Sequence, residues 1–162
     1  MDAEAFLAMG RGVLASQPFS VLVGAELAAL SPGRCEMALA ITAPLKQQNG
    51  FAHGGVVSYL ADNALTYAGG TALRVPVVTA EYKINYVRPA IGERLVARAR
   101  AVHVGKSQAV CQCEVFAVTG GMEKLCAVAQ GTIARLSDGA GGADDSGRAD
   151  VAGAEAADGA RP

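Results

Sequence analysis

The sequence predicts an α+β domain in which a curled antiparallel β-sheet wraps around one long central helix, with a short helix at the N-terminus. The run that begins at Gly54 is apolar nearly all round, as in a helix that is buried on every side. Two strand-like runs precede it and four follow it. A sheet that curls around the single helix buries both kinds of element.

The first elements are marked by clear start and stop signals. Apolar residues recur at helical spacing over residues 2–16, and Pro18 stops that pattern. Two strand-like runs follow at 25–30 and 34–41. The turn sequence Ser31-Pro32-Gly33 between them predicts a β-hairpin.

The central helix is expected over residues 54–68, with Gly69-Gly70 ending it. The strands after it are rich in β-branched residues and are separated by turn signals. We expect them to form an antiparallel meander in which each strand pairs with the next. These four runs are 77–87, 94–104, 108–118 and 124–136.

Length and composition divide the chain of 162 residues into a domain over 1–136 and a tail over 137–162. The tail has one valine and no other large apolar residue, so it cannot bury enough surface to fold and is predicted to be disordered. It holds five Asp, one Glu and two Arg, a charge of −4, so the total of −1 leaves +3 on residues 1–136. This mild excess suits an anionic ligand but is too weak for nucleic acid.

The sequence carries no sign of a membrane protein or a secreted one. No window approaches the roughly 20 apolar residues of a membrane helix. The acidic start, Met1 to Glu4, lacks the basic region of a secretory signal. The four cysteines form no CxxC pair and are expected to be reduced core thiols without a metal. We therefore expect a cytoplasmic protein.

The predicted sheet leaves edge strands, which tend to pair with another copy of the same chain. The expected partner is therefore a second copy, in a homodimer or a homotetramer. The sequence does not distinguish these two.

Asp62 is the most informative single residue. It lies two turns into the apolar helix, where a carboxylate without partners would cost several kcal/mol. Either the carboxylate has a functional role, or it turns to solvent or accepts a local hydrogen bond.

Gly54 and Gly55 lie where the same helix begins. The first N–H groups of a helix have no internal partner and carry the positive end of the helix dipole, so they can bind a developing oxyanion. Taken alone, a Gly-Gly pair is as compatible with a simple turn, and His53 beside it with a structural role.

Together these residues resemble a known family. The motifs are His53-Gly54-Gly55 followed by Leu60-Ala61-Asp62, then Asn85-Tyr86-Val87-Arg88-Pro89-Ala90 and Gly105-Lys106-Ser107. They resemble the PaaI-like acyl-CoA thioesterases of the hotdog superfamily over residues 19–136. The resemblance implies the hotdog fold and hydrolysis of an aryl- or medium-chain acyl-CoA to a free acid and CoA.

The resemblance also implies catalytic roles. The N–H of Gly54, with Gly55 nearby, would polarise the thioester carbonyl. Asp62 would be the nucleophile or the general base that activates water, and both alternatives stay open. A carboxamide six residues before the histidine, here Gln47, would position water or the carbonyl, and Thr79 on the next strand would assist Asp62.

Further implied roles concern substrate binding. His53 would fix the loop or the leaving sulfur, and active sites would form between subunits. No metal or cofactor is expected, because coenzyme A enters as part of the substrate. The residues expected to contact the CoA portion are Arg88, Gly105, Lys106 and Ser107.

Two other functions are compatible with this fold. A hotdog hydratase or dehydratase would usually carry Asp and His on one helix, and no histidine follows Asp62 here. A non-catalytic module that binds or senses acyl-CoA would not need Asp62 and Gln47.

Overall fold

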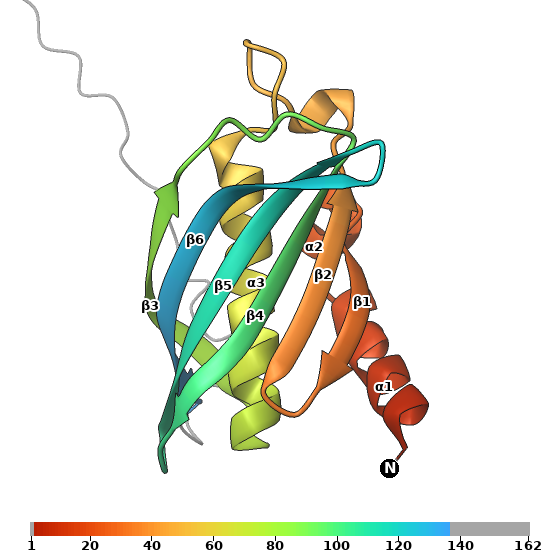
Figure 1. Cartoon of the computed structure of the whole chain (residues 1–162). Coiled ribbons are helices and arrows are strands. Elements are labelled where there is room, and N and C mark those ends of the chain that lie inside the picture. The colour runs from red at the N-terminus through yellow and green to blue at the C-terminus, as the bar shows by residue number, and fades with distance from the viewer. Residues whose placement is uncertain (1, 137–162) are drawn as a thin grey trace, which may run out of the picture.

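The computed structural model describes residues 2–136, so the predicted tail lies outside the described residues. One curved sheet wraps around helix α3, and two smaller helices lie near strand β1 (Figure 1). The helices are α1 (Ala3–Ala15), α2 (Pro18–Val23), the 3₁₀ turn η1 (Ala43–Leu45) and α3 (Gly54–Leu73). The strands are β1 (Glu26–Ser31), β2 (Arg34–Ala40), β3 (Val77–Tyr86), β4 (Arg94–Val104), β5 (Gln108–Thr119) and β6 (Met122–Arg135). The predicted fold class is confirmed.

The strand order, β1-β2-β4-β5-β6-β3, corrects one expectation. All pairs are antiparallel, but the meander contains only β4, β5 and β6, because β3 pairs with β6 at the edge. The segment after β3 crosses the end of the sheet to reach β4 (Figure 1). This order places β3 and β2 on opposite sides of α3, so the sheet encloses the helix. Alternation along a strand indicates which face is buried, not which strand is its neighbour.

The N-terminal helix agrees with its prediction, whereas α2 was not predicted. The Asp2 side chain caps α1 by accepting a hydrogen bond from the Ala5 N–H at 2.7 Å. Pro18 stops α1 but also begins α2, since proline is favoured in the first turn of a helix. No helix in the described residues 2–136 is long and apolar enough to cross a membrane.

Helix α3 is longer than predicted, because Gly69-Gly70 does not end it. The helix continues to Leu73 and ends at Arg74, whose φ of 56° is left-handed. A Cβ atom added to Gly69 would lie only 2.5 Å from the Cβ of Ile133. This glycine therefore allows close packing against β6 rather than stopping the helix, and it leaves no room there for a substrate.

Small residues line the face of the sheet that packs against α3. Alternate residues of β5 and β6 are fully or almost fully buried. Because most of these side chains are short, the helix axis can lie close to the sheet. The cysteines among them act as small apolar residues. The residues are Ala109, Cys111, Cys113, Val115 and Ala117 on β5, and Ala127, Ala129, Gly131 and Ile133 on β6.

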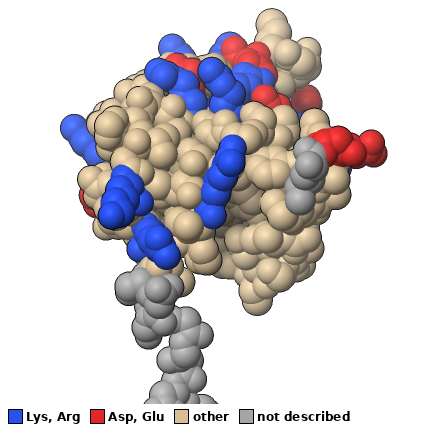
Figure 2. Space-filling model, turned by 90° about the horizontal axis from the view of Figure 1, so that it is seen from below, with Lys and Arg blue, Asp and Glu red and all other residues tan. Residues whose placement is uncertain are grey.

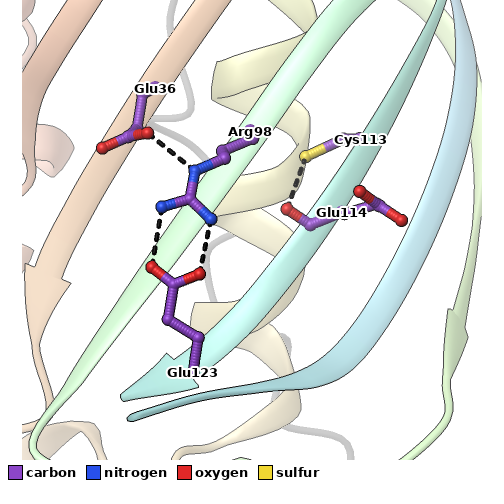
Figure 3. A network of polar contacts seen from close by, with 5 residues as sticks. All are labelled: Glu36, Arg98, Cys113, Glu114 and Glu123. Carbon is purple, nitrogen blue, oxygen red and sulfur yellow. Dashed lines mark hydrogen bonds and ion pairs between the residues drawn. The ribbon is translucent and has the colours of Figure 1, made fainter. Parts of the chain in front are cut away.

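The outer face of the sheet is polar and is organised around Arg98 of β4. Its guanidinium donates to Glu36 on β2 at 2.7 Å and to both carboxylate oxygens of Glu123 on β6, at 2.6 and 2.7 Å (Figure 3). The hydrogen bonds from Arg98 lower the pKa of Glu123. The guanidinium of Arg98 thus links β2, β4 and β6 on the face of the sheet away from α3.

The close contact at Gly69 makes a prediction about stability. Gly69→Ala forces Ile133 to move, so we expect the free energy of unfolding to fall by about 1–3 kcal/mol. The control is Gly12→Ala in α1, where an added Cβ meets nothing within 4 Å. That variant is expected to gain roughly 0.5–1 kcal/mol from helix propensity. Urea denaturation measures both, and parental stability of Gly69→Ala would contradict the packing described.

Candidate active site

The first turn of α3 leaves one backbone donor free. His53 caps the helix, since its Nδ1 accepts a hydrogen bond from the Gly55 N–H at 2.9 Å. The His53 carbonyl accepts from the Val56 N–H at 2.9 Å and the Val57 N–H at 3.3 Å. Among the described residues, nothing accepts from the N–H of Gly54. This N–H is therefore available to a ligand, at the positive end of the helix dipole.

A cavity of about 370 Å³ opens beside this turn. Its lining is mainly apolar and comes from the loop before α3, from α3 itself, from the end of β3 with the segment after it, and from β6. Gly54 lines it, so a carbonyl bound there could approach the free N–H. The other lining residues are Phe51, Ala52, Val57, Tyr86, Val87, Arg88, Pro89, Ala90 and Cys126.

The Asp62 carboxylate is satisfied by a threonine on β3. Thr79 donates its hydroxyl to Asp62 Oδ1 at 2.8 Å, and Asp62 is half-buried. Thr66, one helical turn further along α3, lies 2.9 Å from the Thr79 hydroxyl and 2.9 Å from the Asp62 carbonyl oxygen. Because a hydroxyl carries one proton and Thr79 uses its own on Asp62, Thr66 is the donor in either contact. Thr79 thus orients one carboxylate oxygen and leaves the other free.

Asp62 belongs to a row of α3 residues, spaced by four, that faces β3. Each residue of the row meets a hydroxyl group from β3, which gives a polar α3–β3 seam. Sequence reasoning found Gly54, Asp62 and Thr79 but missed Ser58, Thr66 and the contacts of the two tyrosines. The i+4 spacing was the available signal for Thr66 and Ser58. The contacts are Gly54 O with Tyr86, Ser58 with Tyr82, and Asp62 and Thr66 with Thr79.

Comparison with known proteins identifies the family. The model of the thioesterase superfamily matches residues 49–124. A thioesterase family protein from Silicibacter pomeroyi is 35% identical, with a TM-score of 0.73 over 76% of this chain and 93% of that one. The chain belongs to the thioesterase superfamily.

Other members of the superfamily are also similar. A mutant of the phenylacetic acid degradation protein PaaI from Thermus thermophilus is 35% identical, with a TM-score of 0.65 over 74% of this chain and 100% of that one. The 1,4-dihydroxy-2-naphthoyl-CoA hydrolase of Listeria monocytogenes is 27% identical over 69% of this chain and 90% of the relative. The resemblance to PaaI-like hotdog thioesterases is confirmed.

Within this thioesterase-superfamily chain, Gln47 does not contact Asp62 or Gly54. Its Oε1 accepts a hydrogen bond from the Asn49 N–H at 2.7 Å. The backbone around it is fixed by the Gln47 N–H to Phe51 carbonyl bond at 3.0 Å. Among the described residues, its Nε2 has no hydrogen-bond acceptor. The structure therefore places Gln47 in the loop before α3, with its amide free to donate.

The residues predicted to contact CoA fall into two separate places. Arg88 lines the cavity beside Gly54 and donates to the Leu125 carbonyl. The other three, Gly105, Lys106 and Ser107, form the β4–β5 turn next to Arg135, whose N–H bonds the Ser107 carbonyl at 2.8 Å. That turn lies at the end of the molecule where α3 finishes (Figure 1). One chain does not bring the two groups together.

The end that carries the β4–β5 turn is seen directly in Figure 2. Lys and Arg side chains are spaced across it, and acidic side chains lie toward its edges. This distribution would favour an anionic group such as a phosphate.

The buried cysteines are not candidates for catalysis. Burial raises the pKa of all four cysteines, to about 11 for Cys111 and about 12 for Cys113, so none is a thiolate near neutral pH. Residues 2–136 also contain no group of three His, Cys, Asp or Glu side chains able to hold a metal.

Proposed function

We propose that this protein is an acyl-CoA thioesterase that hydrolyses an aryl- or medium-chain acyl-CoA, with Asp62 and the Gly54 N–H as its catalytic groups. One observation carries the proposal. The only described first-turn N–H of α3 without an acceptor belongs to Gly54, and the same helix carries a carboxylate oriented by Thr79 at 2.8 Å. An oxyanion donor and an oriented carboxylate are the groups that acyl transfer to water requires.

The reaction follows from these two groups. The Gly54 N–H binds the thioester carbonyl oxygen and stabilises the negative charge that develops on it. As a base, Asp62 takes a proton from water while the hydroxide adds to the carbonyl carbon. The tetrahedral intermediate collapses, the C–S bond breaks and CoA leaves as a thiolate. As a nucleophile, Asp62 would instead form an acyl anhydride that water then cleaves.

The two groups are too far apart on one helix to act on one carbonyl. Eight residues of helix span about 12 Å, whereas a donor and an attacking water each lie only about 3 Å from the carbonyl group. The Ser58 and Tyr82 side chains, in contact with each other, also lie between them along the seam. We therefore propose that Asp62 of one chain acts with Gly54 of a partner.

The free edge of β3 supports this pairing. Within the described residues β3 pairs only with β6, and its exposed residues include Val78 and Tyr86, at 48% and 53%. A two-fold axis across this edge would place the Thr79 end of one strand beside the Tyr86 end of the other. The Asp62 of each chain would then face the Gly54 turn of its partner.

Coenzyme A as the thiol portion is supported by the relative from Listeria, which is named for a CoA ester. The mainly apolar cavity beside Gly54 is of a size that suits the acyl or the pantetheine part of such a substrate.

Replacing Asp62 tests its catalytic role. Asp62→Asn keeps the shape and the Thr79 contact but cannot accept a proton or attack, so we expect kcat to fall at least a hundredfold. The measurement is thiol release from a panel of aryl- and alkyl-CoA esters. Glu26→Gln, with a side chain that is 76% exposed, is the control and should match the parent. Parental rates for Asp62→Asn would contradict the assignment, and tight binding of CoA esters without release by the parent would indicate a binding module.

Replacing Gly54 tests the oxyanion donor. Proline is favoured in the first position of a helix and has no N–H, so Gly54→Pro should remove the donor and leave α3 folded. We expect kcat to fall by roughly a hundred- to a thousandfold. Gly54→Ala is the matched control, because it keeps the N–H and its Cβ would lie 3.6 Å from the Tyr86 ring. Equal losses in the two variants, with both folded, would exclude the N–H as the cause.

Mixing two inactive variants tests whether the site is shared between chains. A heterodimer of Asp62→Asn and Gly54→Pro holds one site with both native groups if these come from different chains. A one-to-one mixture assembled from unfolded chains should therefore recover about a quarter of the parental rate. Self-mixtures of each variant are the controls. A mixture as inactive as its components would show that both groups act within one chain.

A further inference from the structure

We propose that Tyr86 and His53 are positioning residues that hold the Gly54–Gly55 peptide from opposite sides and so aim the Gly54 N–H. This inference depends on the proposed function, which assigns that N–H to the oxyanion. Neither side chain needs to touch the reacting atoms for this role.

The contacts form a clamp around one peptide group. The Tyr86 hydroxyl donates to the Gly54 carbonyl oxygen at 3.0 Å. The N–H of the same peptide, on Gly55, donates to His53 Nδ1 at 2.9 Å. On the other side of the donor, the His53 N–H is bound to the Leu45 carbonyl at 2.8 Å. The His53–Gly54 peptide, which carries the free N–H, therefore lies between two fixed neighbours.

Such restraint is needed because the local sequence is unusually flexible. Glycine gives the backbone more freedom than any other residue, and two glycines stand at the start of α3. Helix ends also fray. A donor stabilises a transition state best when it is already aimed before the reaction begins. Because glycine has no side chain, the Gly54-Gly55 pair lets a substrate carbonyl approach the backbone closely. The contacts of Tyr86 and His53 then restrict the backbone motion that the two glycines would otherwise allow.

Tyr86 can provide this order because its own backbone is fixed. It is the last residue of β3 and pairs with Ala127 on β6. The next residue continues the pairing, with the Val87 N–H bound to the Cys126 carbonyl at 2.9 Å. The ring lies against Gly54, where an added Cβ would meet it at 3.6 Å. The sheet thus holds the helix terminus through one side chain.

His53 contributes only while its Nδ1 is unprotonated, because that nitrogen is the acceptor. Its proton then lies on Nε2. A doubly protonated ring could not cap α3 in this way.

The test compares Tyr86→Phe with Tyr82→Phe. Both remove a tyrosine hydroxyl that reaches α3 from β3, but the Tyr82 hydroxyl contacts Ser58 and not the Gly54–Gly55 peptide. We expect Tyr86→Phe to lower kcat roughly tenfold with little change in KM, because the ring that lines the cavity remains. Tyr82→Phe should keep a kcat within about twofold of the parent.

Two further readouts separate positioning from general weakening. Hydrogen exchange of a peptide covering residues 51–57 should be faster in Tyr86→Phe than in Tyr82→Phe. In His53→Ala/Tyr86→Phe, the loss of kcat should be smaller than the product of the single losses, because both residues fix one peptide.

The outcomes are distinct. Unchanged kcat and exchange in Tyr86→Phe, equal effects of the two tyrosine variants, or independent effects of His53 and Tyr86 would each overturn the clamp. A parent protein that hydrolyses no acyl-CoA would overturn the proposed function instead. Hydrogen exchange of the 51–57 peptide would then be the only test of the clamp. Faster exchange in Tyr86→Phe than in Tyr82→Phe would support it, and equal rates in the two variants would reject it.

Discussion

The close packing of α3 against the sheet is the constraint on which the rest of the structure depends. At Gly69 the helix approaches Ile133 so closely that one added carbon atom would lie 2.5 Å away. A helix held at this distance cannot rotate about its axis without collisions. The direction of each α3 side chain is therefore fixed, and the row that contains Asp62 must face β3. Ile133 pairs with Thr79, so the geometry of the polar seam follows from apolar packing directly beside it.

The position of β3 at the edge explains why this row can be polar. A carboxylate facing the centre of the sheet would be fully buried and would need complete compensation. Facing the edge strand, Asp62 is half-buried and needs only the Thr79 hydroxyl on one oxygen. The same strand fixes Gly54 through Tyr86. Within residues 2–136, one Asp62 carboxylate oxygen and the Gly54 N–H thus have no partner, although contacts with β3 fix the direction of both.

Sequence reasoning reached those features that depend on local pattern or on composition. A helix that is apolar on all sides had to be buried, and Asp62 within it required a partner. Strand order depends instead on contacts between distant segments, so the placement of β3 beside β6 was not visible in its alternation. Gly69-Gly70 was misread because the same residue type both ends helices and permits close packing. Tyr86 was quoted within a motif, but its contact with Gly54 joins residues 32 positions apart.

The division of the candidate substrate-binding residues between the two ends of the molecule has a simple geometric resolution. Gly54 and Arg88 lie at one end of the molecule. Lys106 lies toward the other end, as does Thr79, the residue that donates to Asp62. The proposed two-fold axis across β3 reverses one chain relative to its partner. It would therefore bring the Lys106 turn of one chain toward the Gly54 end of the other, by the same operation that joins Asp62 to Gly54. A single two-fold axis would thus bring together the catalytic groups and also the basic residues Arg88 and Lys106. In one chain both sets are split between the two ends of the molecule.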